Sequence, residues 1–236
     1  MNTSGGLAEF IRVPATWPIL LPETLTLREA MIYGTAGLTA ALCLNKIEDA
    51  GAQPDDGEVV VTGATGGVGT MAIAMLAQKG YSVTAVTGKL EANSMLTGLG
   101  ASKLIDRRSL DELAAKPMAK PQWAHGVDCL GGDYLFTLLK SLRYGGSVAA
   151  CGLAASSDLK GNVFPFILRN VNLLGVDSVE LPLKIKQRAW QSLATELKLP
   201  ALGSMAEEIS LEQVPQYLDQ IFNGQALGRY LVKLID

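Results

Sequence analysis

The chain is poor in the residue types that build metal centres, disulfide frameworks and ionisable catalytic sites. Its 236 residues include one histidine, three cysteines and only 6% aromatic residues. Cys43, Cys129 and Cys151 are odd in number, lie far apart and form no C-x-x-C pair. Neither a zinc site nor a disulfide framework is therefore expected, and a reducing cytoplasm is the expected location.

Strong charge is also missing. Charged residues make up 18% of the chain, and the formal net charge is −3. A nucleic-acid or anionic-membrane partner would leave a basic footprint, so neither is expected. The longest uncharged run, residues 59–78, contains a glycine-rich turn, which favours a strand–turn–helix over a membrane span. The N-terminus shows no basic region followed by an apolar one, so no secretion signal is expected.

What the chain does have is a regular alternation of strand-like and helix-like segments separated by glycines. This alternation predicts an α/β fold with a parallel sheet and helices on both faces. We expect a Rossmann-type, doubly wound sheet with strand order 3-2-1-4-5-6. The expected strands are 58–62, 81–86, 103–105, 126–130, 147–151 and 171–176, and the expected helices between them are 70–79, 91–99 and 134–142.

Both ends lie outside that alternation. Thr26 and Glu29 have capping-box spacing, which predicts the start of a helix. Two further helices are expected over 183–198 and 211–222, the second preceded by a capping box at Ser210. A last strand is expected over 228–235.

The segment from Thr62 to Gly69, Thr-Gly-Ala-Thr-Gly-Gly-Val-Gly, is the main functional signal. Glycines let the backbone approach a pyrophosphate, and the helix N-terminus behind them offers unpaired N–H groups. The position between a strand and a helix favours dinucleotide binding, although a tight turn alone can also require glycines. No G-K-[ST] follows, which excludes a Walker-type loop.

The end of the second strand favours NADP over NAD. NAD-binding proteins usually place an acidic residue there for the ribose 2′-hydroxyl. This chain instead has Thr87, Gly88 and Lys89, with no acid before Glu91. A hydroxyl, an open backbone and a cation suit a 2′-phosphate, and the missing acid also disfavours a methyltransferase. The alternative is a surface lysine that follows a turn glycine.

No ionisable catalytic group can be assigned. No tyrosine is followed four residues later by lysine, and no G-x-S-x-G occurs. We expect His125 in a loop, and Cys129 and Cys151 in buried strands as core residues. A hydride-transfer site needs no such group, because the cofactor carries the chemistry.

Taken together, these stretches resemble the medium-chain dehydrogenase/reductase superfamily. The resemblance is to its zinc-free, quinone-oxidoreductase-like branch, closest to the acrylyl-CoA reductase (NADPH) subgroup. It spans nearly the whole chain, and residues 165–170 and 175–179 are the segments most specific to the subgroup. The other resembling segments are 5–9, 34–40, 48–51, 59–69, 99–102, 144–146, 150–153 and 228–233.

The resemblance implies NADPH as the cofactor and assigns residues to it. Thr65, Gly66, Gly67 and Val68 would hold the pyrophosphate. The 2′-phosphate would lie on the segment from Thr87 to Lys89, with Arg107 as a second cation. The residues implied at the nicotinamide end are Leu153, Ile167 and Ser178, with Asn223 as a further cofactor contact.

The resemblance also implies a domain division and an activity. Residues 1–34 would be a remnant of a GroES-like domain, 35–178 the NADP-binding domain, and 179–236 helices and a strand that return to the first domain. Family members carry about 80 to 90 more N-terminal residues, and the edges left without them suggest a homo-oligomer such as a dimer. The implied activity is reduction of an α,β-unsaturated acyl-CoA, with a quinone or enal reductase, or a cofactor-binding module without turnover, as alternatives.

Overall fold

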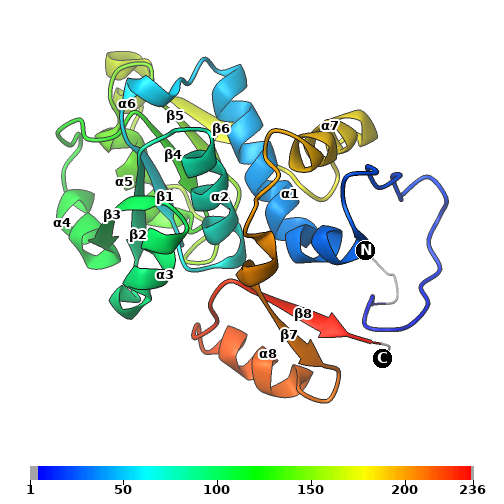
Figure 1. Ribbon diagram of the computed structural model, residues 1–236. Coiled ribbons are helices and arrows are strands. Elements are labelled where there is room, and N and C mark those ends of the chain that lie inside the picture. The colour runs from blue at the N-terminus through cyan, green and yellow to red at the C-terminus, as the bar shows by residue number, and fades with distance from the viewer. Residues whose placement is uncertain (1–4, 235–236) are drawn as a thin grey trace.

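The structure, a computed structural model described here for residues 5–234, has a six-stranded parallel sheet at its centre (Figure 1). The strand order is β3-β2-β1-β4-β5-β6, which confirms the predicted order and the α/β class. The strands are β1 (Val59–Thr62), β2 (Val83–Thr87), β3 (Ala101–Asp106), β4 (His125–Asp128), β5 (Ser147–Ala150) and β6 (Asn172–Gly175).

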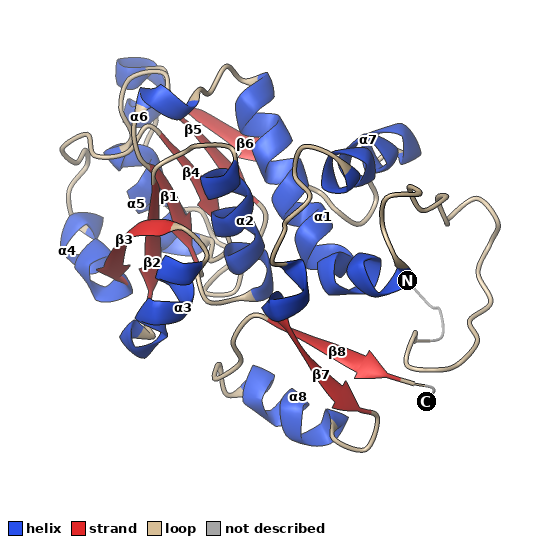
Figure 2. Cartoon of the chain, in the orientation of Figure 1, coloured by secondary structure: helices blue, strands red, loops and turns tan. Residues whose placement is uncertain are grey.

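The sheet is buried on both faces because successive strand residues point to opposite sides. Val59 and Val61 belong to one hydrophobic cluster, whereas Val60 between them belongs to the other. Helices lie on both sides of the sheet, as Figure 2 shows, and contribute residues to each cluster beside those of the other strands. The first cluster is formed with α1 (Leu27–Asp49), α2 (Gly67–Gln78), α3 (Asn93–Gly98) and α7 (Leu183–Ala194), and the second mainly with α5 (Gly132–Ser141).

Helix α1 begins where the capping box predicts. The Thr26 hydroxyl accepts a hydrogen bond from the Glu29 backbone N–H, and the Glu29 carboxylate accepts one from the Thr26 N–H at 2.8 Å. The hydrogen bond that the Glu29 carboxylate accepts from the Thr26 N–H stabilises its charged form and lowers the pKa of Glu29. The helix is interrupted at Gly34, whose φ of 48° and ψ of −150° are not helical. A residue with a side chain would be strained at that kink.

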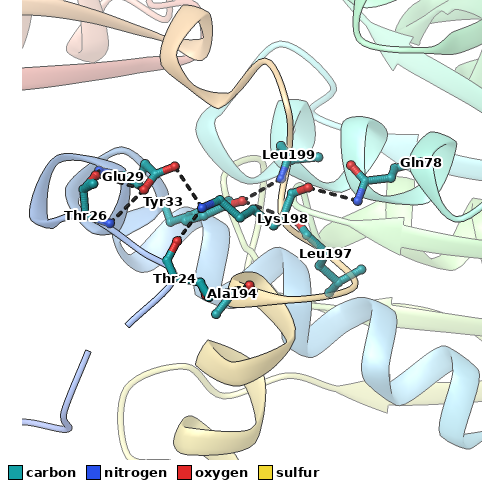
Figure 3. A network of polar contacts seen from close by, with 9 residues as sticks. All are labelled: Thr24, Thr26, Glu29, Tyr33, Gln78, Ala194, Leu197, Lys198 and Leu199. Atoms are coloured by element: carbon teal, nitrogen blue, oxygen red, sulfur yellow. Dashed lines mark hydrogen bonds and ion pairs between the residues drawn. The ribbon is translucent and has the colours of Figure 1, made fainter. Parts of the chain in front are cut away.

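A polar network ties α1 to the segment after α7 (Figure 3). The buried Tyr33 hydroxyl accepts a hydrogen bond from the Leu199 N–H at 2.9 Å and donates to the Leu197 carbonyl at 3.4 Å. Lys198 pairs with Glu29 at 3.3 Å and also donates to the Thr24 carbonyl. The network fixes the N-terminal half of α1 beside the sheet, since it holds the backbone of two distant segments.

The C-terminal residues form a small unit below the main sheet in Figure 1. Strands β7 (Ala206–Ser210) and β8 (Arg229–Lys233) pair in parallel, and α8 (Val214–Phe222) connects them. The prediction of β8 is confirmed, but β7 was missed because its Ala-Glu-Glu-Ile-Ser sequence is poor in β-formers. The capping box at Ser210 is half formed, with only the Ser210 N–H bonded to Gln213, and α8 begins three residues later than expected.

Two other expectations need correction. Helix α7 ends at Ala194 rather than 198, because Thr195 leaves the helical region at φ −128° and ψ −102°. The short helices α4 (Asp111–Ala114) and α6 (Phe164–Arg169) were not expected. Residues 5–26 contain turns but neither a helix nor a strand.

His125 is the first residue of β4 and is buried, so its expected placement in a loop is wrong. Its Nε2 lies 3.1 Å from Asp56, and its Nδ1 accepts a hydrogen bond from the Ser147 N–H at 3.2 Å. Because Nδ1 is an acceptor, the ring is held in one tautomer between a carboxylate and a backbone amide. The residue therefore has a structural role.

Across residues 5–234, no helix is long and apolar enough to cross a membrane.

Candidate dinucleotide-binding site

A candidate anion-binding site lies at the turn from β1 to α2, at the carboxyl end of the sheet. Gly66 is the N-cap of α2 and offers no side chain to the first helical N–H groups, and no acidic residue occupies the first turn. These N–H groups have no partner within a helix, and the positive end of the helix dipole lies beside them. The turn therefore suits an anion, as the glycine pattern predicts.

The glycines of this turn are required for different reasons. A Cβ on Gly69 would lie 2.3 Å from the Gly63 carbonyl oxygen, so α2 can pack on the end of β1 only if residue 69 is glycine. Gly66 has φ −81° and ψ 172°, which any residue can adopt, and a Cβ there would meet only the Gly63 oxygen, at 3.3 Å. The turn conformation hardly demands glycine at 66, whereas close approach of a ligand does.

The predicted 2′-phosphate residues come together at the ends of β2 and β3. The Thr87 hydroxyl accepts a hydrogen bond from the Lys89 N–H at 3.0 Å. Arg107 follows β3. Its Nη2 would lie 3.3 Å from a Cβ atom if Gly88 carried one, so the guanidinium stands beside the Gly88 backbone. The Arg107 guanidinium also lies 5.7 Å above the ring of Tyr134. Two cations and a hydroxyl thus flank the open backbone of Gly88.

Lys89 is half-buried, and burial lowers its pKa because the ammonium loses water. Its Nζ donates to the Ala226 carbonyl at 2.6 Å, which brings the segment before β8 to the same place. An anion beside Lys89 would offset the cost of burying this charge. The residues present therefore fit a 2′-phosphate.

Sequence reasoning missed Arg229, which lies between the turn and the kink of α1. If Gly67 carried a Cβ atom, that atom would lie 3.1 Å from Arg229 Cδ and 3.4 Å from Arg229 Nη1. A Cβ atom on Gly34 would lie 2.6 Å from Arg229 Nη2. Burial lowers the pKa of Arg229, and no carboxylate among residues 5–234 forms an ion pair with it. The Gly228 N–H donates to the Thr65 carbonyl at 2.9 Å, which ties the start of β8 to the turn.

Arg229 is a half-buried cation that donates to the Ile32 carbonyl at 3.2 Å, and beside an anion-binding turn it is a further group able to contact a pyrophosphate. The only signal for it in the sequence is the Gly-Arg pair that opens the last strand, and nothing near residue 229 connects it with a turn 160 residues earlier.

The floor of the site is the point where the strand order reverses, between β1 and β4. The Thr62 hydroxyl donates to the Asp128 carboxylate at 2.6 Å and accepts from the Cys129 N–H at 3.1 Å. The Gly131 N–H donates to the same carboxylate at 2.7 Å. Burial raises the pKa of Asp128. This clamp fixes the loop after β4 against the end of β1.

The residues implied at the nicotinamide end are less closely grouped. Leu153, in the loop after β5, is 68% exposed, and Ile167, on α6, is 69% exposed. Asn223 is an exposed residue at the C-terminus of α8. Ser178 follows β6 and lines a groove of about 350 Å³ with Gly34, Thr35 and residues of α7. The roles of these four residues stay predictions.

Comparison with known proteins shows the family to which the chain belongs. A family model described as zinc-binding dehydrogenase matches residues 67–196. The acrylyl-CoA reductase AcuI of Ruegeria pomeroyi is 44% identical over 97% of this chain and 69% of that protein. The chain belongs to the zinc-binding dehydrogenase family. The resemblance to medium-chain dehydrogenases/reductases is thereby confirmed.

Two solved structures are similar over nearly the whole chain. Escherichia coli K-12 YhdH with bound NADPH has a TM-score of 0.93 at 47% identity, over 98% of this chain and 71% of that one. Bacillus subtilis yhfP with NAD bound has a TM-score of 0.94 at 45% identity, over 98% of this chain and 70% of that one.

Among residues 5–234, no group of three or more His, Cys, Asp or Glu side chains is placed so that it could hold a metal ion.

The packing of the turn predicts opposite outcomes for two substitutions. Gly69→Ala should lower the free energy of unfolding by about 1–3 kcal/mol, because its methyl group overlaps the Gly63 carbonyl. Gly66→Ala should change it by well under about 1 kcal/mol, because only a small adjustment is needed. Urea unfolding followed by circular dichroism measures both. Equal losses for the two variants would contradict the assignment of the packing role to Gly69.

Proposed function

We propose that the chain is part of an NADPH-dependent oxidoreductase that reduces an α,β-unsaturated acyl-CoA thioester, as in the conversion of acrylyl-CoA to propionyl-CoA. The observation that carries the cofactor is the pairing of the uncapped turn at Gly66 with the two cations around Gly88. The acyl-CoA substrate is supported by the name of the Ruegeria relative.

The cofactor would be held at two places. The turn from Thr65 to Val68 and the guanidinium of Arg229 would take the pyrophosphate. Thr87, Gly88, Lys89 and Arg107 would take the 2′-phosphate. The NADPH-bound E. coli structure supports this choice, while the NAD-bound Bacillus structure makes the preference a point to measure.

When bound, NADPH supplies the hydride, and the protein has to position the substrate and exclude water. The groove beside Ser178 is mostly apolar, with Ile19, Leu21 and Trp190 among its lining residues. Its polar side chains are Thr35, Ser178 and Lys186. These side chains and the indole N–H of Trp190 are the donors available to hold a thioester carbonyl as negative charge develops on its oxygen.

A quinone or enal reductase on the same scaffold is the second candidate. It is supported by the quinone oxidoreductase of Mus musculus, which is 26% identical over 99% of this chain. The cofactor site would be the same, so only the second substrate separates these candidates.

Removing one cation should change the cofactor preference. We expect Lys89→Gln to weaken NADPH binding about ten- to a hundredfold, since a hydrogen bond to a charged group contributes about 1.5–3 kcal/mol. Glutamine can still donate to the Ala226 carbonyl, so the local fold should be kept. NADH affinity should change little. Isothermal titration calorimetry with both cofactors measures the difference.

Lys103→Gln is the matched control, because Lys103 is an exposed lysine on the neighbouring strand β3. It should leave both affinities unchanged. Equal weakening of NADPH and NADH by Lys89→Gln would show that Lys89 does not read the 2′-phosphate.

The substrate is tested by NADPH oxidation with acrylyl-CoA, an enal and a quinone. The chain covers 71% of the E. coli relative, so each assay is run with the chain alone and with the part of that relative that the chain does not match added. We expect acrylyl-CoA to be the best substrate and the added part to raise the rate, because it would close the groove to water.

Faster turnover of the quinone than of acrylyl-CoA in both arms would favour the second candidate. Binding of NADPH with no turnover in either arm would favour a cofactor-binding module.

Three further predictions stay predictions: the domain division at residues 34 and 178, assembly into a dimer, and a cytoplasmic location.

A further inference from the structure

The three cysteines, scattered in the sequence, meet in one place in the fold. Cys129 directly follows β4, Cys151 directly follows β5, and Cys43 lies on α1 with its thiol against that of Cys151. The Sγ atoms of Cys129 and Cys151 are 3.9 Å apart. Cys129 and Cys151 were expected within buried strands. This is wrong, because β4 and β5 each end one residue earlier and both cysteines are partly exposed.

The backbone already has the spacing that a disulfide needs. Strands β4 and β5 are parallel neighbours, and Asp128 pairs with Ala150, so Cys129 and Cys151 stand one step beyond an in-register pair. The Cys151 N–H donates to the Asp128 carbonyl at 2.9 Å, so the strands are still paired there. Neighbouring strands lie about 4.8 Å apart, within the range of Cα separations that disulfides span. To be joined, the two sulfurs would have to approach from 3.9 Å to about 2.05 Å.

The three thiols are not equivalent. Hydrogen bonds from the thiols of Cys129 and Cys43 lower the pKa of Cys151. The hydrogen bonds to Cys151, together with burial, raise the pKa of Cys43 and of Cys129. The Cys151 thiol, which also donates to the Asp128 carbonyl at 3.3 Å, is therefore the one of the three whose pKa is lowered, and the thiolate is the reactive form. Cys43 is fully buried, which leaves Cys129 as the partly exposed neighbour.

The pair lies at the carboxyl ends of the central strands. Cys129 Cβ is 3.1 Å from the position of a Cβ on Gly63, the first glycine of the anion-binding turn. The Cys129 N–H is also held by Thr62. In this fold a dinucleotide crosses the same edge.

We propose that Cys129 and Cys151 form a dithiol site that hydrogen peroxide oxidises to a disulfide between β4 and β5, and that bound NADPH shields this site. The shielding rests on the proposed function, whereas the disulfide does not.

The reaction balances as two thiols and one peroxide giving one disulfide and two waters. The Cys151 thiolate attacks one peroxide oxygen, the O–O bond breaks, and the departing hydroxide takes up the thiol proton to become water. Cys151 is then a sulfenic acid. The Cys129 sulfur attacks the Cys151 sulfur, the S–O bond breaks, and the second oxygen leaves as water with the Cys129 proton.

Peptide mapping tests the disulfide directly. The reduced chain without cofactor is treated with hydrogen peroxide, alkylated, digested with trypsin and analysed by mass spectrometry without reduction. Cleavage after Lys46, Lys140 and Arg143 places the three cysteines on different peptides. We expect a cross-link between the peptides of Cys129 and Cys151 that dithiothreitol reverses. A cross-link through Cys43, or sulfinic acid without a cross-link, would overturn the proposal.

Two variants provide matched controls. Cys43→Ala should keep the cross-link and Cys129→Ser should abolish it, and loss of the cross-link in Cys43→Ala would overturn the assigned pair. Because the mapping uses the unmodified chain, the proposal can be tested even if a variant fails to fold.

The shielding is measured by repeating the oxidation with saturating NADPH. We expect the cross-linking rate to fall at least about tenfold, and an unchanged rate at confirmed saturation would overturn the shielding. NADPH binding is followed separately by its fluorescence. Absence of binding would count against the proposed function and leave the cross-link in the free chain as the test of the dithiol site.

Discussion

The contact on which the site depends is the packing of Gly69 against the backbone of Gly63. It lets the first turn of α2 rest on the end of β1, so that the helix N-terminus points along the edge where the strand order reverses. The clamp between Thr62 and Asp128 holds the next loop at the same level. The start of β8 then binds to the turn through Gly228 and brings Arg229 beside Gly67.

The sheet could be predicted because its signals are local. Short β-branched runs, helix formers and glycines alternate between residues 58 and 176, and the family resemblance agrees with them. The capping box at Thr26 is also local, and it forms as expected. Strand β7 could not be predicted, because Glu207 and Glu208 have low strand propensity and the strand exists only through its pairing with β8.

The site was predicted in part for the same reason. The glycine turn and the segment from Thr87 to Lys89 are continuous in sequence, and Arg107 joins them because β2 and β3 are neighbours. Arg229 and the three thiols depend on contacts between residues more than 80 positions apart or on separate strands, and no spacing rule connects them. His125 was misplaced because a histidine next to a glycine is typical of a loop, whereas here Asp56 and Ser147 satisfy its ring inside the sheet.

The central claim is that one continuous surface, from the uncapped turn of α2 to the cations around Gly88, binds NADPH. Hydrogen–deuterium exchange with mass spectrometry tests it most directly, with NADH and NADPH compared at saturation. The account predicts that both cofactors slow exchange of the amides of residues 67–69, and that only NADPH slows it further at residues 88–89. Protection confined to other parts of the chain, or the same pattern with both cofactors, would contradict the account.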